Sequence, residues 1–168
     1  MKGASDQPRP ESSGAASILA LDLGGKTGWA LHQADGTITS GTVEFKPGRF
    51  EGGGMAFVRF KHWLDEVLRF AGPVNSVFFE EVRAHAGVSA AHAYGGFLAH
   101  LTAWAELQEI PYRGVPVGTI KRHATGKGNA SKAEVMEAMR RKGHTPCDDN
   151  AADALAILHF VLDEEVTP

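Results

Sequence analysis

The chain has 168 residues, 43% hydrophobic and 22% charged, with a formal net charge of −3 and one cysteine. This composition is typical of one globular domain, and a single cysteine excludes an intramolecular disulfide or a cysteine-rich zinc site. No apolar stretch has the length of a membrane span, so no membrane partner is expected. Residues 1–16 are rich in Ser, Gly, Pro and charge, which predicts a disordered tail before a single domain over 17–168.

Short aliphatic and β-branched runs alternate with helical patterns along the rest of the chain. The expected strands are 17–23, 28–33, 37–45, 74–82 and 112–117. The expected helices are 55–70, 90–108, 119–124, 132–142 and about 149–162. This order predicts an α/β fold in which an antiparallel meander is followed by a mixed sheet with helices on both faces. Gly95 and Gly96 weaken the second helix, which indicates the close approach of another backbone.

Four acidic residues, far apart in the sequence, lie within or beside apolar runs: Asp22, Glu80, Asp149 and Asp153. A carboxylate in such a place is costly to desolvate unless it is paired, hydrogen-bonded or bound to a cation. Asp22 and Glu80 meet if their strands are neighbours, and Asp149 and Asp153, four residues apart, share one helix face. Because Mg²⁺ prefers oxygen ligands, the pattern predicts a divalent-cation site suited to phosphodiester hydrolysis.

Some of these acidic positions also have structural interpretations. Asp22 precedes two glycines and could belong to a strand-to-turn transition. Glu81 is expected to point away from Glu80, toward solvent or a salt-bridge partner, because side chains alternate along a strand. Asp148 is predicted to cap the last helix. Asp153 lies inside an Ala-rich helix, where no such structural role explains it.

Positive charge is concentrated in residues 113–144, which contain eight Lys or Arg residues against two acids. Such a block is compatible with phosphate contact, and it is equally compatible with solvated helix faces. Lys121 and Lys132 flank a Gly-rich turn that contains Lys127, and the first two are the better candidates for contacts with a DNA backbone. Ser131 and Glu134 have the spacing of a capping box that begins a helix.

Eight histidines show no spacing typical of a zinc site. His85, His92 and His100 are therefore expected to be packing or surface residues. No site for an organic cofactor is predicted.

Four motifs, in order, are similar to those of a known family: Leu21–Gly24, Phe79–Val82, the Gly-rich segment 126–132 and Asn150–Ala156. In this combination the chain resembles the RuvC-type Holliday junction resolvases of bacteria and phages. The resemblance implies a ribonuclease H-like fold with a five-stranded mixed sheet, three antiparallel strands and then two parallel ones. It also implies a homodimer that cuts a four-way DNA junction symmetrically with Mg²⁺, for which Mn²⁺ can substitute. The expected location is the cytoplasm of a bacterial cell, or of the host if the source is viral.

The resemblance assigns roles to individual acids. Asp22, Glu80 and Asp153 would be metal ligands. The family often has an acid three residues before the last aspartate, where this chain has Asn150. Either Asp149 supplies the missing ligand, or the site has only three carboxylates.

The resemblance also assigns contacts with DNA. Lys121 and Lys132 would contact the backbone near the scissile phosphate, and Lys127 is a further candidate. Arg83 replaces an aromatic residue that the family associates with opening the junction, and it is included among the DNA contacts. The residue that would open the junction in this chain is not assigned. The Ala- and Gly-rich second helix is the expected dimer interface.

Three other functions are consistent with parts of the sequence. The stretch Asp22–Gly28 also resembles the first phosphate loop of sugar kinases and actin-like ATPases, but those proteins close two such domains around a nucleotide. A RuvC-like nuclease that processes RNA would use the same core and the same first aspartate. A noncatalytic protein of this fold that binds branched DNA would tolerate Asn150.

Overall fold

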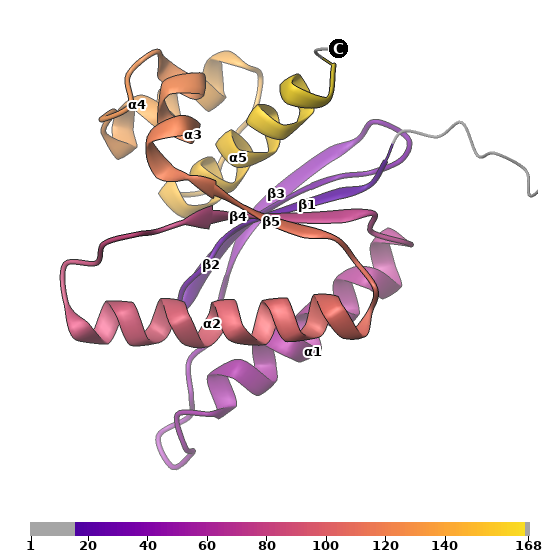
Figure 1. The fold of residues 1–168 in the computed structure, drawn as a ribbon, viewed down its shortest axis with the longest axis vertical. Coiled ribbons are helices and arrows are strands. Elements are labelled where there is room, and N and C mark those ends of the chain that lie inside the picture. The colour runs from indigo at the N-terminus through magenta and orange to yellow at the C-terminus, as the bar shows by residue number, and fades with distance from the viewer. Residues whose placement is uncertain (1–15, 167–168) are drawn as a thin grey trace, which may run out of the picture.

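The computed structural model describes residues 16–166, so nearly all of the tail predicted at 1–16 lies outside the described residues. A single five-stranded sheet, in the order β3-β2-β1-β4-β5, runs through the molecule (Figure 1). Its strands are β1 (Ile18–Asp22), β2 (Lys26–His32), β3 (Ile38–Glu44), β4 (Ser76–Glu81) and β5 (Tyr112–Pro116). Each expected strand is present, within a few residues of the expected bounds.

Strand pairing follows the predicted order. β1 pairs antiparallel with β2, and β2 pairs antiparallel with β3. β4 lies parallel to β1 on its other side, and β5 lies parallel to β4 at the edge. The sheet therefore has three antiparallel strands followed by two parallel ones, which confirms the predicted fold class.

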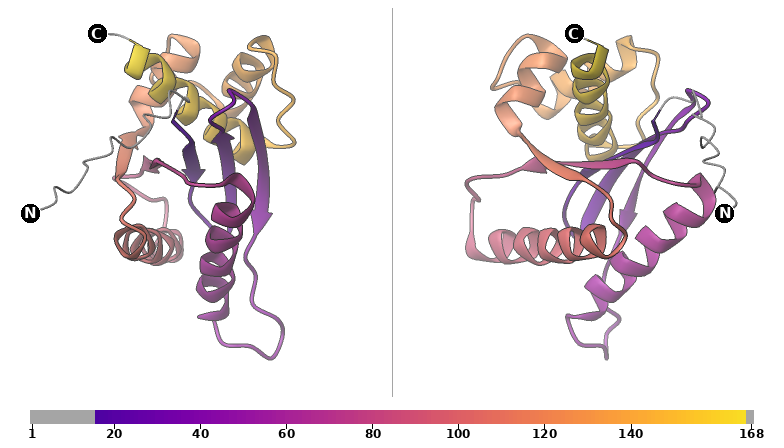
Figure 2. Two further views of the ribbon diagram at one scale, coloured as in Figure 1. Left: turned by 90° about the vertical axis from the view of Figure 1, so that its right-hand side faces the viewer. Right: turned by 45° about the vertical axis from the view of Figure 1, so that its right-hand side comes forward.

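Five helices cover the two faces of the sheet (Figures 1 and 2). They are α1 (Met55–Ala71), α2 (Val88–Leu107), α3 (Val117–Thr125), α4 (Lys132–Arg141) and α5 (Asp149–Val166). α1 and α2 lie on one face, and α3, α4 and α5 lie on the other. Across residues 16–166, no helix has both the length and the apolar character needed to cross a bilayer.

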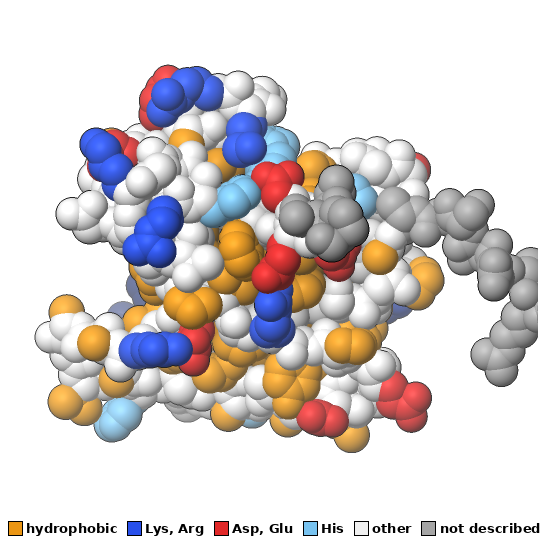
Figure 3. Space-filling model, turned by 45° about the horizontal axis from the view of Figure 1, so that its top comes forward, with side chains coloured by type: hydrophobic (Ala, Val, Ile, Leu, Met, Phe, Trp, Pro, Cys, Tyr) orange, Lys and Arg blue, Asp and Glu red, His pale blue; other side chains and the backbone are white. Residues whose placement is uncertain are grey.

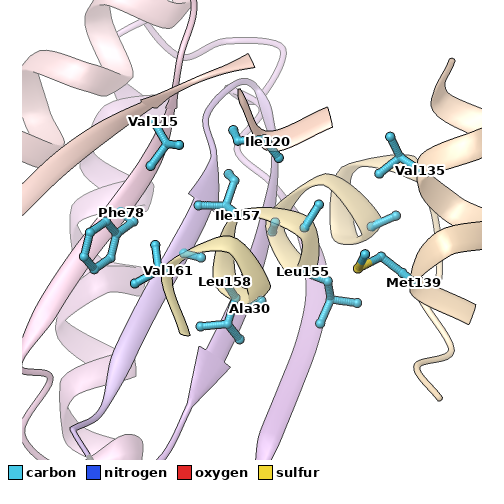
Figure 4. Packing of buried hydrophobic residues seen from close by; sticks show 14 of the residues in the cluster. Ala30, Phe78, Val115, Ile120, Val135, Met139, Leu155, Ile157, Leu158 and Val161 are labelled. Carbon is cyan, nitrogen blue, oxygen red and sulfur yellow. The ribbon is translucent and has the colours of Figure 1, made fainter. Parts of the chain in front are cut away.

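Alternation of side chains along the strands divides the core into two clusters. Ile18 and Ala20 of β1 pack under α5, whereas Leu19 and Leu21 pack under α1 and α2. Strands that are buried on both faces read as continuous apolar runs, which is why the β1 sequence shows no polar alternation. Figure 4 shows the cluster under α5, where Ile157 and Val161 face the sheet. By the same alternation, Asp22 and Ala20 belong to the face that α5 covers.

The first turn of α5 lies against the backbone of β2. A Cβ atom added at Gly28 would lie 1.9 Å from the carbonyl oxygen of Asn150, so only glycine fits here. Buried alanines follow at Ala151 and Ala152 and keep this part of the helix close to the sheet. Asp148 accepts a hydrogen bond from the backbone N–H of Ala151 at 2.9 Å, which confirms its predicted capping role.

The interpretation of the glycine pair in α2 was wrong. Gly95 has no atom close to its added Cβ position, and Gly96 faces the ring of Phe57, whose nearest atom would lie 2.5 Å from the Cβ. A side chain from α1, and not another backbone, occupies the space that the missing side chain leaves. The predicted capping box of α4 is confirmed, because Ser131 and Glu134 each accept a hydrogen bond from the other's backbone N–H.

Candidate active site

Asp22 and Glu80 lie at the carboxyl ends of two adjacent parallel strands. The register pairs Leu21 of β1 with Phe79 of β4, so the next residue of each strand lies beside the other on the face under α5. The two carboxyl groups are close enough for each to change the pKa of the other. Ligands in open α/β sheets bind at the carboxyl ends of such strands. The expected meeting of these acids therefore occurs.

α5 brings Asp153 to the same place. Asp153 lies one turn into the helix, between the buried residues Ala152 and Ala154, and its charge acts on that of both Asp22 and Glu80. The close contact at Gly28 sets the distance between α5 and the sheet. Three of the four predicted acids thus converge from β1, β4 and α5.

Burial and the charges of neighbouring acids make the ionised forms of these carboxyl groups less favourable. Burial, followed by the charges of Glu80 and Asp153, raises the pKa of Asp22 to about 8. Burial and the charge of Glu80 raise the pKa of Asp153 to about 6. Burial also raises the pKa of Glu80. Lys132 offsets only part of this effect on the three acids, and a divalent cation would provide the further positive charge that favours their ionised forms.

The fourth acid has a different partner. Asp149 forms an ion pair with Lys132, the first residue of α4, and this hydrogen bond lowers the pKa of the Asp149 carboxyl. The same pair raises the pKa of Lys132. Asp149 thus lies on the same side of α5 as Asp153, as its spacing predicts, but it contacts a lysine.

Within residues 16–166, no group of three or more His, Cys, Asp or Glu side chains is arranged to hold a metal ion. The chemistry of the donor set nevertheless fits a hard cation, because all four groups are carboxylates. Asp22, Glu80 and Asp153 are gathered and Asp149 is paired with Lys132, so Asp22 would have to ionise and the side chains would have to adjust before they enclosed an ion.

Tyr94 of α2 holds the end of β4, a role that sequence reasoning missed. Its hydroxyl donates to the backbone carbonyl of Glu80 at 2.8 Å and accepts from the backbone N–H of Val82 at 3.3 Å. The two bonds fix the backbone on either side of Glu81. No local pattern links Tyr94 to Glu80. The close contact at Gly28, by contrast, could have been predicted, because a glycine inside a strand often marks the close approach of another backbone.

Basic side chains surround the acids. The positive charges of Lys121 and Lys132 both act on Glu80. Lys127 is paired with Glu134 at 3.0 Å, at the turn before α4. Figure 3 shows Lys and Arg side chains over the part of the molecule formed by α3 and α4. Two lysines of the predicted positive segment, Lys121 and Lys132, therefore lie near the acids.

Arg83 follows β4 and is paired with Glu81 at 3.5 Å, which confirms the expected salt-bridge role of that glutamate. Both side chains are largely exposed. The ring of His85 lies 5.0 Å from that of Tyr94, and His100 stacks on Phe57. His92 is exposed, so these three histidines are packing or surface residues as expected.

The chain was compared with known proteins. No protein-family model matches it. The crossover junction endodeoxyribonuclease RuvC of Synechococcus sp. (strain CC9311) is 32% identical over 127 residues, which span 71% of this chain and 74% of that protein. The chain belongs to the RuvC family. The resemblance seen in the four sequence motifs is thereby confirmed.

Solved RuvC structures have the same fold. RuvC of Thermus thermophilus in complex with a Holliday junction substrate superposes with a TM-score of 0.71, at 23% identity over 87% of this chain and 92% of that one. A second structure of T. thermophilus RuvC gives 0.67 at 22% identity, over 89% and 96%. The yeast mitochondrial Holliday junction resolvase Ydc2 gives 0.58 at 13% identity, over 86% and 77%. These likenesses confirm the ribonuclease H-like fold predicted for this RuvC-family chain.

Proposed function

We propose that this chain is an endodeoxyribonuclease that resolves four-way DNA junctions with a divalent cation. The observation that carries the proposal is the convergence of Asp22, Glu80 and Asp153 at the ends of β1, β4 and the first turns of α5. Membership of the RuvC family supports the substrate, since a relative of known structure is bound to a Holliday junction.

Asp22, Glu80 and Asp153 would hold the cation. Asp149 would join them when its ion pair with Lys132 is broken. Bound there, two Mg²⁺ or Mn²⁺ ions would supply a nucleophilic water and stabilise charge on the phosphoryl oxygens. The elevated pKa of Asp22 means that this residue releases a proton when it becomes a ligand near neutral pH. Tyr94 keeps the Glu80 backbone in place while this happens.

Positive residues beside the acids would bind the DNA backbone. Lys121 and Lys132 are the lysines whose charges lower the pKa of Glu80, so they would contact the scissile strand. Lys127 and Arg83 lie farther out, in ion pairs that phosphates would compete for. Such contacts give affinity that falls steeply with salt.

We further propose that the protein works as a homodimer that makes symmetric nicks, with α2 as the interface. Six of the exposed residues of α2 form a stripe without acidic or Lys/Arg side chains at helical spacing: Val88, His92, Gly95, Ala99, Ala103 and Leu107. Small side chains of this kind allow two helices to approach closely. We also propose that the described residues form one domain and that the protein acts in the cytoplasm.

A cleavage assay tests the proposal. Purified protein is incubated with a labelled four-way junction, a linear duplex and an RNA–DNA hybrid while Mg²⁺ or Mn²⁺ is titrated. We expect paired, symmetric cuts in the junction alone. Asp22→Asn should abolish cutting and keep junction binding in a gel-shift assay, because it removes a ligand without a change of shape. Glu165→Gln, an exposed acid at the end of α5, is the matched control.

Other outcomes would replace the proposal. Preferential cutting of the hybrid would support the RNA-processing alternative. Tight junction binding without cuts at any cation concentration would support the noncatalytic binder. Full activity of Asp22→Asn would remove the metal role of that residue.

A further inference from the structure

The face of the sheet opposite the acids contains an apolar cavity of about 300 Å³ between α1 and strands β2 and β3. We call it the aromatic recess. Its walls include Trp29 and Leu31 from β2 and Trp63, Glu66, Val67 and Phe70 from α1. The proposed nuclease chemistry uses none of these residues.

Trp29 lines the recess, and its indole ring lies over β3. The register pairs Trp29 with Gly41 on β3, which has no side chain. A Cβ added at Gly41 would lie 3.0 to 3.1 Å from three atoms of the indole, so the ring lies flat over this glycine. The strand covers one ring face, and the opposite face is turned away from β3.

Trp63 forms a second aromatic wall. It stacks on Phe60 with ring centroids 6.2 Å apart and planes at 20°, and its other neighbour in the core is Phe45 at 5.8 Å. The centroids of Trp63 and Trp29 are 6.5 Å apart, and their planes are inclined at 54°. Two indoles, each supported from behind by the protein, thus meet at an angle around one cavity.

Glu66 provides the charge of the recess. It is the only ionisable residue among those that line the cavity. Within residues 16–166, its carboxylate has no hydrogen bond or ion pair. An unpaired carboxylate beside two indole faces attracts a cation, since the ring faces carry negative electrostatic potential.

Few hydrogen-bond acceptors are present to replace the water around a primary ammonium group. Besides Glu66, the lining offers the polar side chains of Gln33 and Thr39. A quaternary ammonium group donates no hydrogen bonds, so it loses little on entering such a cavity. The volume suits a small ligand with few non-hydrogen atoms.

We propose that the aromatic recess binds a small, soluble quaternary ammonium compound, with its cationic head against Trp29 and Trp63 and its charge balanced by Glu66. This site is separate from the acidic cluster, because the sheet lies between them. Binding should therefore be unaffected by Asp22→Asn, so that failure of either proposal is distinguishable from failure of the other.

Choline is the probe, and its neutral isostere 3,3-dimethyl-1-butanol is the comparison. Binding to the full-length protein is measured by isothermal titration calorimetry and by tryptophan fluorescence. Trp104 is fully buried in the core and gives a constant background. We expect saturable choline binding about tenfold tighter than that of the isostere, from two cation–π contacts and one carboxylate.

Three variants and one control separate the contribution of the charge from that of the aromatic ring. Glu66→Gln should weaken choline binding severalfold and leave the isostere unchanged, whereas Glu165→Gln should change neither. Trp29→Leu should lose more choline affinity than Trp29→Phe, because the phenyl ring keeps a π face. Circular dichroism and thermal melting establish that each variant is folded.

Two results would overturn the proposal. The first is equal affinity for choline and the neutral isostere, which would make the recess an ordinary apolar cavity. The second is the absence of a saturable choline signal at tens of millimolar with the folded wild-type protein.

Discussion

Replacing Asp22 by asparagine should make the metal-free protein more stable, and increasingly so as the pH rises. The pKa of Asp22 is raised to about 8 from an ordinary value of 3.8, so the folded state favours the neutral carboxyl. The folded state then binds more protons than the unfolded state between these two values, and stability falls as the pH rises through them. Above both values the loss is complete, and below both it is absent.

The magnitude follows from the same two values. One pKa unit corresponds to about 1.4 kcal/mol, so between about pH 5 and pH 8 the wild type should lose on the order of 3 kcal/mol through this group. An asparagine side chain cannot ionise, so this contribution disappears in Asp22→Asn. A divalent cation would reverse the order of the two proteins, because only the wild type gains from binding it.

Urea denaturation in EDTA, repeated at several pH values from about 5 to 8, measures the effect. The gap between Asp22→Asn and the wild type should widen with pH, and added Mg²⁺ should close it by stabilising the wild type. Glu165→Gln removes an exposed carboxylate and should give a curve parallel to that of the wild type. Parallel curves for Asp22→Asn and the wild type would refute the argument that burial suppresses ionisation at this site.

Three further substitutions test other contacts. Gly28→Ala places a methyl group against the backbone carbonyl at the start of α5, so it should lower the free energy of unfolding, measured with urea, by about 3 kcal/mol. Gly25→Ala, with open space around the added methyl group, should lower it far less. Equal losses of stability would contradict the close contact at Gly28. Tyr94→Phe removes both hydroxyl bonds at β4 and should lower stability by about 1 to 2 kcal/mol along with the cleavage rate, and an unaltered rate would remove its positioning role. Lys132→Ala should reduce the slope of log affinity for junction DNA against log salt by about one, unlike Lys61→Ala on α1, and identical slopes would mean that Lys132 contacts no phosphate.

The sequence was sufficient for the sheet and for the gathering of acids. Continuous apolar runs located β1 and β4, and the acid at the end of each run marked the functional edge before any pairing was known. The prediction that Asp22 and Glu80 meet required only that their strands be neighbours, which the register confirms. Strand ends shifted by a few residues, because local patterns do not define where pairing stops.

Contacts between segments distant in sequence were the part that could not be predicted. Lys132 and Asp149 were each singled out for a different role, yet their ion pair depends on how α4 docks beside α5. The neighbour of Gly96 could not be predicted from composition, because a missing side chain makes room without indicating whether a backbone or the ring of Phe57 fills it.

The four acids differ in how firmly the surrounding core holds them, and this difference affects how an ion would be bound. Asp22, Glu80 and Asp153 are attached to segments whose neighbouring residues are buried in the core, so their backbones cannot move without repacking it. The Asp149 side chain lies at the start of α5 and is paired with Lys132, a lysine whose side chain is largely exposed. Completing a coordination shell therefore requires a change of rotamer at one place, and the rigid remainder of the protein can act as a template for it.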